Sequence, residues 1–165
     1  GQGVRKQCEV VGMAEIAFNE DLVVLIDQPG TYDEVEQAMA AVLLNQGYVR
    51  DSYAKAIADR EAVYPTGLEF GDHGIAMPHC DIEHVVSPAI CMGVLKRPVE
   101  WRRMDDPEAT CQAELVVMLA LNEAHAHLEM LQKVVALLQN QELVAQIVSS
   151  ETASEAYSLA KDQLL

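Results

Sequence analysis

The sequence predicts an α/β protein, a three-layer α/β/α sandwich built on a central mixed β-sheet of about five strands. Short apolar segments of strand length alternate along the 165-residue chain with longer segments whose apolar residues recur at helical spacing. Capping signals open several of the helical segments, and glycine or proline follows two of them. Half of the residues are hydrophobic, which at this length supports a single domain with a sizeable core.

The N-terminal half predicts one strand and two helices. Residues 21–27 (DLVVLID) form a short apolar run typical of a buried strand, and a Gln-Pro-Gly turn follows it. Thr31 and Glu34 form a capping box for a helix that ends near Gly47. Asp51 is the expected cap of a second helix, which ends at a Tyr-Pro-Thr-Gly sequence. The expected inner faces are Val35, Met39, Val42 and Leu43 in the first helix and Ala54, Ile57, Ala58 and Ala62 in the second.

The C-terminal half predicts the remaining strands and three helices. Strands are expected at residues 74–78, 89–95 and 114–121, with a short edge strand at 99–101. Helices are expected to start at Asn122, at Asn140 and at a second capping box, Thr152 to Glu155. The first of these helices should turn one face to the core, made of Leu128, Leu131, Val134, Val135 and Leu138.

Composition excludes several classes of function. The formal net charge is −15, whereas a free-standing nucleic-acid binder presents a basic stripe. No apolar run approaches the roughly 20 residues of a membrane span, so no membrane insertion is expected. The sequence shows no export signal and no C-x-x-C motif, so we expect a cytoplasmic protein with free thiols. The acidity fits either simple solubility or the steering of a basic partner protein.

The chain begins GQGVRKQC rather than with Met. We therefore expect residues 1–18 to be an N-terminal extension or a remnant of expression, and the folded domain to occupy residues 19–165.

The segment GIAMPHCDIEH, residues 74–84, places a histidine at the end of a predicted strand. Pro78 fixes its own φ angle and keeps Met77 extended, so a stiff backbone presents the imidazole of His79. If this is the carboxyl end of a sheet strand, it is the place where open α/β sheets carry their sites. A lone histidine at such a position also fits a surface or structural role.

Two further residues are candidate site residues. His127 falls in the first or second turn of the helix that starts at Asn122, where the helix dipole favours a neutral imidazole and a bound anion, such as a phosphoryl group. Arg60 can bind two phosphate oxygens in a fork, although it equally fits an ordinary helix-surface arginine.

Other chemistries fit the sequence less well. The set His73, His79, Cys80 and His84 has zinc-binding residue types but no standard zinc spacing. A Cys80–His127 nucleophilic pair has no supporting local signature. The chain contains neither a P-loop nor G-x-G-x-x-G, so no nucleotide cofactor is expected.

Four segments together resemble a known family. They are Arg60-Glu61 with the following PTGL, GIAMPH ending at His79, LVVMLA at residues 115–120, and His127-Leu128 with Leu131. In order and spacing they resemble the EIIA components of the bacterial sugar phosphotransferase system (PTS), of the fructose/mannitol class (type 2). The resemblance extends across residues 19–164, nearly the whole chain.

The resemblance implies a fold and a phosphoryl relay. The family fold is a mixed sheet sandwiched by helices. His79 matches the histidine that accepts a phosphoryl group from the histidine phosphocarrier protein (HPr), His127 a second active-site histidine, and Arg60 an arginine beside them. An EIIB component then receives the group and phosphorylates sugar during transport through the membrane component EIIC. No metal or organic cofactor is implied.

The residue after the histidine bears on the subtype. Pro78-His79-Cys80 resembles the galactitol-type branch, whereas mannitol- and fructose-type members usually carry Gly after the histidine. The related nitrogen-regulatory EIIA proteins share the fold and the histidine, so a phosphorylation-dependent signalling role is the alternative.

Overall fold

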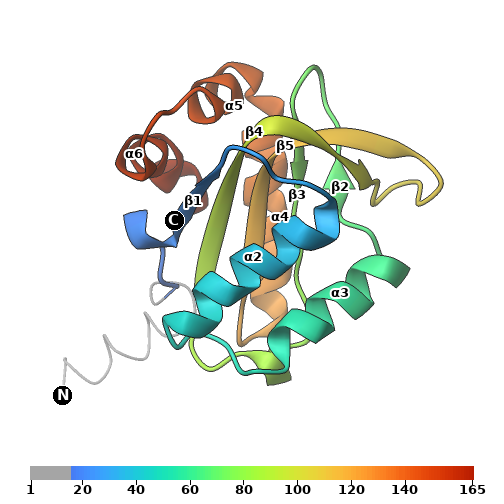
Figure 1. Ribbon diagram of the computed structural model, residues 1–165, viewed down its shortest axis with the longest axis vertical. Coiled ribbons are helices and arrows are strands. Elements are labelled where there is room, and N and C mark those ends of the chain that lie inside the picture. Colours follow the sequence, from blue (N-terminus) through green and yellow to red (C-terminus); the bar gives the residue numbers. More distant parts are fainter. Residues whose placement is uncertain (1–15) are drawn as a thin grey trace.

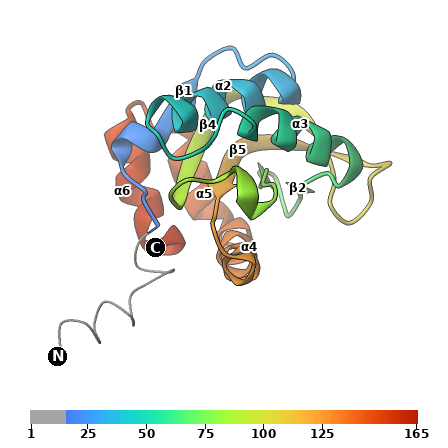
Figure 2. The same cartoon turned by 90° about the horizontal axis from the view of Figure 1, so that it is seen from below.

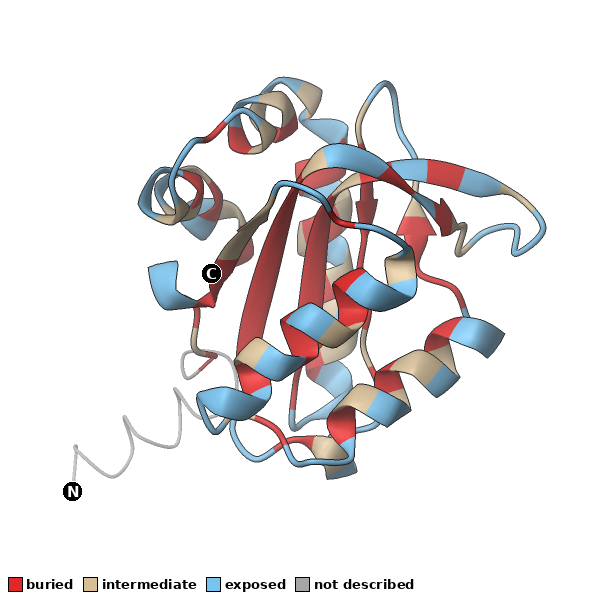
Figure 3. Cartoon of the chain, viewed as in Figure 1, coloured by how far each residue is buried: buried red, intermediate tan, exposed pale blue. Residues whose placement is uncertain are grey.

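The computed structural model describes residues 16–165, which form a five-stranded mixed sheet in the order β1-β4-β5-β3-β2 (Figure 1). β1 runs parallel to β4, and β5 runs parallel to β3, while β4 with β5 and β2 with β3 are antiparallel. The central strands β4 and β5 are buried over most of their length (Figure 3). The strands are β1 (Val23–Ile26), β2 (Gly67–Leu68), β3 (Gly74–Ala76), β4 (Ala89–Arg102) and β5 (Thr110–Ala120).

Helices cover both faces of this sheet, which confirms the predicted three-layer sandwich. One layer consists of α2 (Tyr32–Asn45) and α3 (Tyr53–Val63). The other contains α4 (Ala124–Gln139), α5 (Gln141–Val148) and α6 (Ala153–Leu164). Seen from below in Figure 2, α2 and α3 lie on one side of the sheet and α4 on the other. Two short 3-10 helices, η1 (Glu20–Leu22) and η2 (Ile82–His84), complete the described fold.

Local capping signals predicted three helix starts correctly. In α2 the Thr31 hydroxyl accepts from the Glu34 N–H, and the Glu34 carboxylate accepts in return from the Thr31 N–H. The Asn140 and Thr152 side chains cap α5 and α6 by accepting from the N–H groups of Leu143 and Glu155, without a return bond from the helix. The other two caps were each placed one residue early, since the observed N-caps are Ser52 and Glu123 rather than Asp51 and Asn122.

Two strand predictions need correction. The segments predicted at 89–95 and 99–101 are one strand, β4, which stays paired with β5 on both sides of a register shift between Val94 and Val99. The two-residue strand β2 was missed because it is too short to show a pattern. It requires glycine, because a Cβ on Gly67 would lie 2.5 Å from the carbonyl oxygen of Arg102.

The inner faces of two helices also differ from the prediction. In α3 the buried residues are Tyr53, Ile57 and Glu61, while Ala62 is exposed. In α4 the buried face runs through Ala126, Met130, Val134, Leu137 and Leu138, and Leu128 is 55% exposed. Leu128 therefore faces solvent and Glu61 faces the core, and both lie close to the candidate site described below.

Packing begins at the first described residues. Ile16 and Phe18 are buried, and Ala17 pairs with Ala89 beside β4. The rest of the expected extension, residues 1–15, lies outside the described part of the chain. Cys80, Cys91 and Cys111 are free and buried, as expected for thiols, and Cys8 lies outside the described residues. No helix within residues 16–165 is long and apolar enough to cross a membrane.

Candidate functional site

The sheet topology brings His79 and His127 together. His79 follows the carboxyl end of β3, and β3 runs parallel to β5, so both strands end at the same edge of the sheet. The Leu119 N–H of β5 donates to the Pro78 carbonyl oxygen at 2.9 Å, which holds the turn before His79 against that edge. Helix α4 starts shortly after β5 and carries His127 in its first turns. The two imidazole ring centroids are 5.2 Å apart.

Arg60 reaches the same place from the opposite helical layer. It lies in the last turn of α3, and two cavities of about 260 and 270 Å³ are each lined by Arg60, His79 and His127. The three residues singled out from the sequence, from three different elements, therefore surround one site. Such clefts beyond the carboxyl ends of sheet strands are common positions for binding sites in α/β proteins.

A hydrogen bond fixes the tautomer of His79. Its Nδ1 lies 2.9 Å from the carbonyl oxygen of Met77. A carbonyl oxygen can only accept, so Nδ1 carries the proton and Nε2 is left with a lone pair. Burial lowers the pKa of His79 below its ordinary value of 6.5, although the bond to Met77 acts in the opposite direction. At neutral pH the ring is therefore an uncharged nucleophile.

Two buried nitrogen atoms beside His79 have no hydrogen-bond partner within residues 16–165: Nε of Arg60 and Nε2 of His127. Burial first, and then the nearby His79 and Arg60, lower the pKa of His127 to about 4. Leaving a buried polar group without a partner costs about 1–3 kcal/mol. These two groups are positioned to bind something the chain itself does not supply, and an anion suits the arginine.

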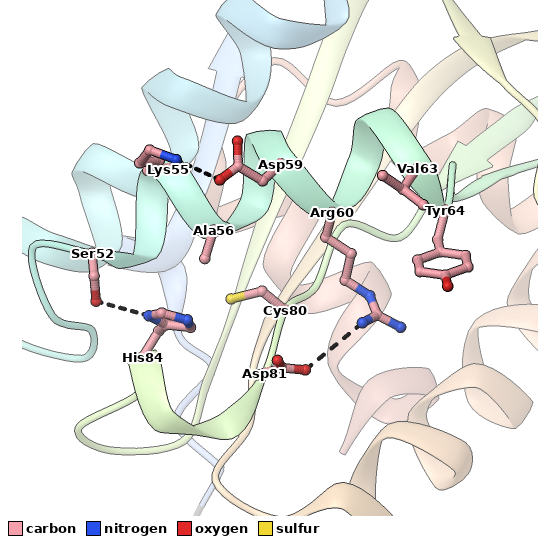
Figure 4. A pocket seen from close by; sticks show the side chains of 10 residues that line it. All are labelled: Ser52, Lys55, Ala56, Asp59, Arg60, Val63, Tyr64, Cys80, Asp81 and His84. Carbon is pink, nitrogen blue, oxygen red and sulfur yellow. Dashed lines mark hydrogen bonds and ion pairs between the residues drawn. The ribbon is translucent and has the colours of Figure 1, made fainter.

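The guanidinium of Arg60 is only loosely held. It lies 3.7 Å from a carboxylate oxygen of Asp81 and 5.3 Å from the ring centroid of Tyr64. Figure 4 shows the side chain extending from α3 between these two residues. Since 3.7 Å exceeds hydrogen-bond distance, the guanidinium keeps its donors for an incoming anion.

The cavity drawn in Figure 4, about 460 Å³, adjoins this site between α3 and the segment from Cys80 to His84. Its polar groups are largely paired with one another. The Ser52 hydroxyl lies 2.8 Å from Nδ1 of His84, and Lys55 lies 2.7 Å from Asp59. It therefore offers fewer free donors than the site around His79.

The alternative chemistries find no support in the geometry. Burial raises the pKa of the Cys80 thiol to about 12, so the thiolate that nucleophilic catalysis needs is absent at neutral pH. His73 pairs with Glu114 at 2.7 Å, and His84 contacts Ser52, so the four candidate metal ligands are dispersed. Among the residues described, no three His, Cys, Asp or Glu side chains are grouped as metal ligands.

Sequence reasoning missed two polar residues beneath the site, Glu36 and Glu61. They are 0% and 4% exposed. A signal for Glu61 was present, since it follows the buried Ile57 by four residues on the inner face of α3. Acidic residues on an otherwise apolar face mark positions whose partners come from other parts of the fold.

Comparisons with known proteins show the family of this chain. The family described as "Phosphoenolpyruvate-dependent sugar phosphotransferase system, EIIA 2" matches residues 16–163. The galactitol-specific EIIA component of Escherichia coli is 30% identical over 116 residues, which is 70% of this chain and 77% of that protein. The mannitol-specific EIIA component of Staphylococcus aureus is 28% identical, over 87% of this chain and 93% of that protein.

Solved structures show the same fold. The crystal structure of IIA mannitol from E. coli has a TM-score of 0.71 at 22% identity and covers 87% of this chain and 99% of its own. The complex of E. coli enzyme IIA mannitol with phosphorylated enzyme IIB mannitol has a TM-score of 0.72 at 21% identity, and the match covers 89% of this chain and 99% of that chain. The chain therefore belongs to the EIIA type 2 family of the sugar phosphotransferase system and is a phosphotransferase component.

Proposed function

We propose that this protein is a cytoplasmic phosphoryl carrier that accepts a phosphoryl group from phospho-HPr on Nε2 of His79 and passes it to an EIIB component. The observation that carries the proposal is the arrangement at the strand edge. A neutral imidazole with its Nε2 lone pair free shares a cavity with Arg60 and His127, each of which has a buried nitrogen without a partner in the described chain.

The chemistry follows from these positions. Nε2 of His79 attacks the phosphorus of phosphohistidine on HPr, the new N–P bond forms as the old one breaks, and the imidazole of HPr leaves. The Met77 carbonyl accepts the Nδ1–H and stabilises the positive charge that develops on the ring. Phosphoryl transfer passes through a loose transition state with charge on the equatorial oxygens, so positioning and charge stabilisation provide most of the catalysis. Arg60 is a proposed donor to those oxygens, and His127 becomes a second donor when its Nε2 takes up a proton as the negatively charged phosphoryl group enters the cavity.

The second transfer reverses these roles. A cysteine or histidine of EIIB attacks the phosphorus, and His79 leaves as neutral imidazole whose Nδ1–H still donates to the Met77 carbonyl oxygen. The proposal of an EIIB partner draws on the structural neighbour, enzyme IIA mannitol, which was solved in complex with phosphorylated enzyme IIB mannitol.

The surface around the site suits a transient protein partner. Exposed apolar side chains border the cavities, namely Val63, Tyr64, Ile82 and Leu128, which are 43–63% exposed. The chain carries a formal net charge of −15, so a basic partner with an apolar centre would be attracted to this protein. We expect its association rate with HPr to fall as salt is added; a rate that salt leaves unchanged would count against steering.

A sugar or polyol of the galactitol type is the favoured transport substrate of the system. The support is the similarity to the galactitol-specific EIIA component of E. coli together with the Pro78-His79-Cys80 sequence. The membrane component EIIC would complete the pathway.

The test is stepwise phosphotransfer. The protein is incubated with phosphoenolpyruvate, the general phosphotransferase enzyme and HPr, and its phosphate is then offered to EIIB components of different sugar specificity. We expect an acid-labile, base-stable label that only a cognate EIIB removes, and no label on His79→Ala. A label retained by His79→Ala would refute the assignment. Full labelling with no transfer to any EIIB would favour the nitrogen-regulatory signalling role instead.

A further inference from the structure

A buried carboxylate lies beneath the site at the origin of a hydrogen-bond chain. Glu61 on α3 is 4% exposed, and its two oxygens accept three hydrogen bonds. The Thr66 N–H donates to Oε2 at 2.7 Å, the Thr66 hydroxyl donates to Oε1 at 2.8 Å, and the Trp101 indole N–H donates to Oε2 at 3.1 Å. Both N–H groups donate to Oε2, so this oxygen carries no proton and acts only as an acceptor.

Glu36 of α2 completes this arrangement. It is 0% exposed, and neither of its oxygens has a donor within residues 16–165. Glu61 is close enough to influence its ionisation, and two buried negative charges near each other repel. Burial, and then the nearby Glu61, raise the pKa of Glu36 well above its ordinary value of 4.5, so Glu36 is a neutral acid beside the Glu61 side chain.

From Glu61 a series of hydrogen bonds leads to His79, the proposed phosphoryl acceptor. Thr66, anchored through both its N–H and its hydroxyl, accepts from the Met77 N–H with its carbonyl oxygen at 3.2 Å. The Met77 carbonyl oxygen in turn accepts from Nδ1 of His79 at 2.9 Å. Beyond it, the Pro78 carbonyl is fixed by the Leu119 N–H at 2.9 Å.

These contacts determine where the Met77 carbonyl points. That carbonyl belongs to the peptide bond before Pro78, which has no N–H to anchor it. Its direction is therefore set by the fixed residues on either side, by Thr66 through the Met77 N–H and by β5 through Pro78. If the hydrogen bond between the Met77 N–H and Thr66 is lost, the Met77 carbonyl can rotate away. Nδ1 of His79 then loses the partner that makes Nε2 the free nitrogen.

We propose that Glu61 is a positioning residue for phosphoryl transfer: its carboxylate holds Thr66, which holds Met77, which keeps His79 in the Nδ1–H tautomer with Nε2 facing the cavity. The expected effect on the rate of phosphoryl transfer rests on the proposed function. The expected effect on the tautomer of His79 concerns the unphosphorylated protein alone.

The direct readout is the tautomer of His79, measured by long-range ¹H–¹⁵N NMR on the unphosphorylated protein. Glu61→Gln keeps the shape of the side chain but replaces one of the two acceptor oxygens with an NH₂ group, so one of the three hydrogen bonds to Glu61 is lost or reversed. We expect the Nδ1–H fraction of His79 to fall, kcat for transfer from phospho-HPr to fall about tenfold, and KM to change less than about twofold. Folded Glu61→Gln with the wild-type tautomer and kcat would overturn the proposal.

Glu114→Gln is the matched control. It removes a half-buried carboxylate that lies 2.7 Å from Nδ1 of His73, toward the end of β5 away from the site. We expect it to keep the wild-type tautomer of His79 and the wild-type kcat even if it lowers Tm. A loss equal to that of Glu61→Gln would mean that general destabilisation explains both variants, and the proposal would fail.

A second pair of variants decides the question if Glu61→Gln does not fold. Thr66→Val removes the hydroxyl bond and keeps the N–H bond, so a partial loss of the Nδ1–H tautomer is expected, and Thr66→Ser should restore it. Wild-type behaviour of Thr66→Val would overturn the proposal. If wild-type protein accepts no phosphoryl group from phospho-HPr, the proposed function fails, but the tautomer comparison still decides the role of Glu61.

Discussion

The buried glutamate pair makes a quantitative prediction about stability and pH. Glu36 is 0% exposed, so burial first, and then the nearby Glu61 and Asp33, raise its pKa well above the ordinary value of 4.5. In the folded protein the side chain keeps its proton at neutral pH, whereas in the unfolded chain it releases the proton above about pH 4.5. The folded state therefore binds one proton more than the unfolded state across the neutral range.

The sign and size of the effect follow from proton linkage. A state that binds an extra proton is weakened as pH rises, so this group's contribution is fully present below about pH 4.5 and is lost progressively above it. The slope is about 1.36 kcal/mol per pH unit. Glu36→Gln, which carries no titrating proton, removes this slope. Between about pH 5.5 and 7.5 the wild type should lose about 2.7 kcal/mol of unfolding free energy relative to the variant.

Urea unfolding monitored by circular dichroism, at several pH values for both proteins, measures this difference. Every other titrating group is common to the two, so most of the background pH dependence cancels in the comparison. Equal m-values would show that both proteins unfold from equally compact states. Parallel stability curves for wild type and Glu36→Gln would refute the reasoning, since they would mean that Glu36 is ionised in the folded protein.

Three further predictions concern the site and its supports. Arg60→Ala and His127→Ala should each slow phosphoryl transfer to His79 by about 5- to 150-fold, which corresponds to about 1–3 kcal/mol. Rapid-quench assays with phospho-HPr measure these rates. Unchanged rates would exclude contact with the phosphoryl oxygens. Because burial lowers the pKa of His127 to about 4, its folded-state contribution is present above about pH 6.5 and is lost as pH falls toward 4. His127→Gln should therefore gain stability relative to wild type on acidification, as followed by urea unfolding, and no relative gain would contradict the neutral ring. Gly67→Ala should lower stability by about 1–3 kcal/mol, seen in Tm, because its Cβ would lie 2.5 Å from the Arg102 carbonyl oxygen; an unchanged Tm would show that β2 can shift.

Features that depend on neighbouring residues were predictable from the sequence. The capping box at Thr31 and Glu34 needs only a three-residue spacing, and the structure forms both of its hydrogen bonds. The apolar run in β5 is long and buried, so its pattern indicated a buried strand. Where two neighbouring residues could both cap, as at Asp51 and Ser52, the sequence alone did not determine which one does.

Features that depend on the tertiary fold were not predictable from local pattern. Lys96, Arg97 and Pro98 interrupt the apolar run of β4, so the sequence showed two strands where pairing with β5 maintains one. Burial of Glu61 depends on donors from Thr66 and Trp101, and the indole lies 40 residues away in the sequence.

The candidate site combines both kinds of information. The stiff Met77-Pro78 backbone indicated that His79 is presented at a strand end, and its position after β3 agrees with that. That Arg60 and His127 lie beside it came from resemblance to a family, because only the parallel pairing of β3 with β5 and the path of α3 bring the three together.

The most direct test of the central claim is to identify the phosphorylated atom. The wild-type protein, phosphorylated through HPr, is examined by tandem mass spectrometry for the residue and by ³¹P and long-range ¹H–¹⁵N NMR for the nitrogen. A single phosphoryl group on Nε2 of His79, with Nδ1 still protonated, is the expected result. Phosphate on Nδ1, on His127 or on any other residue would contradict the account.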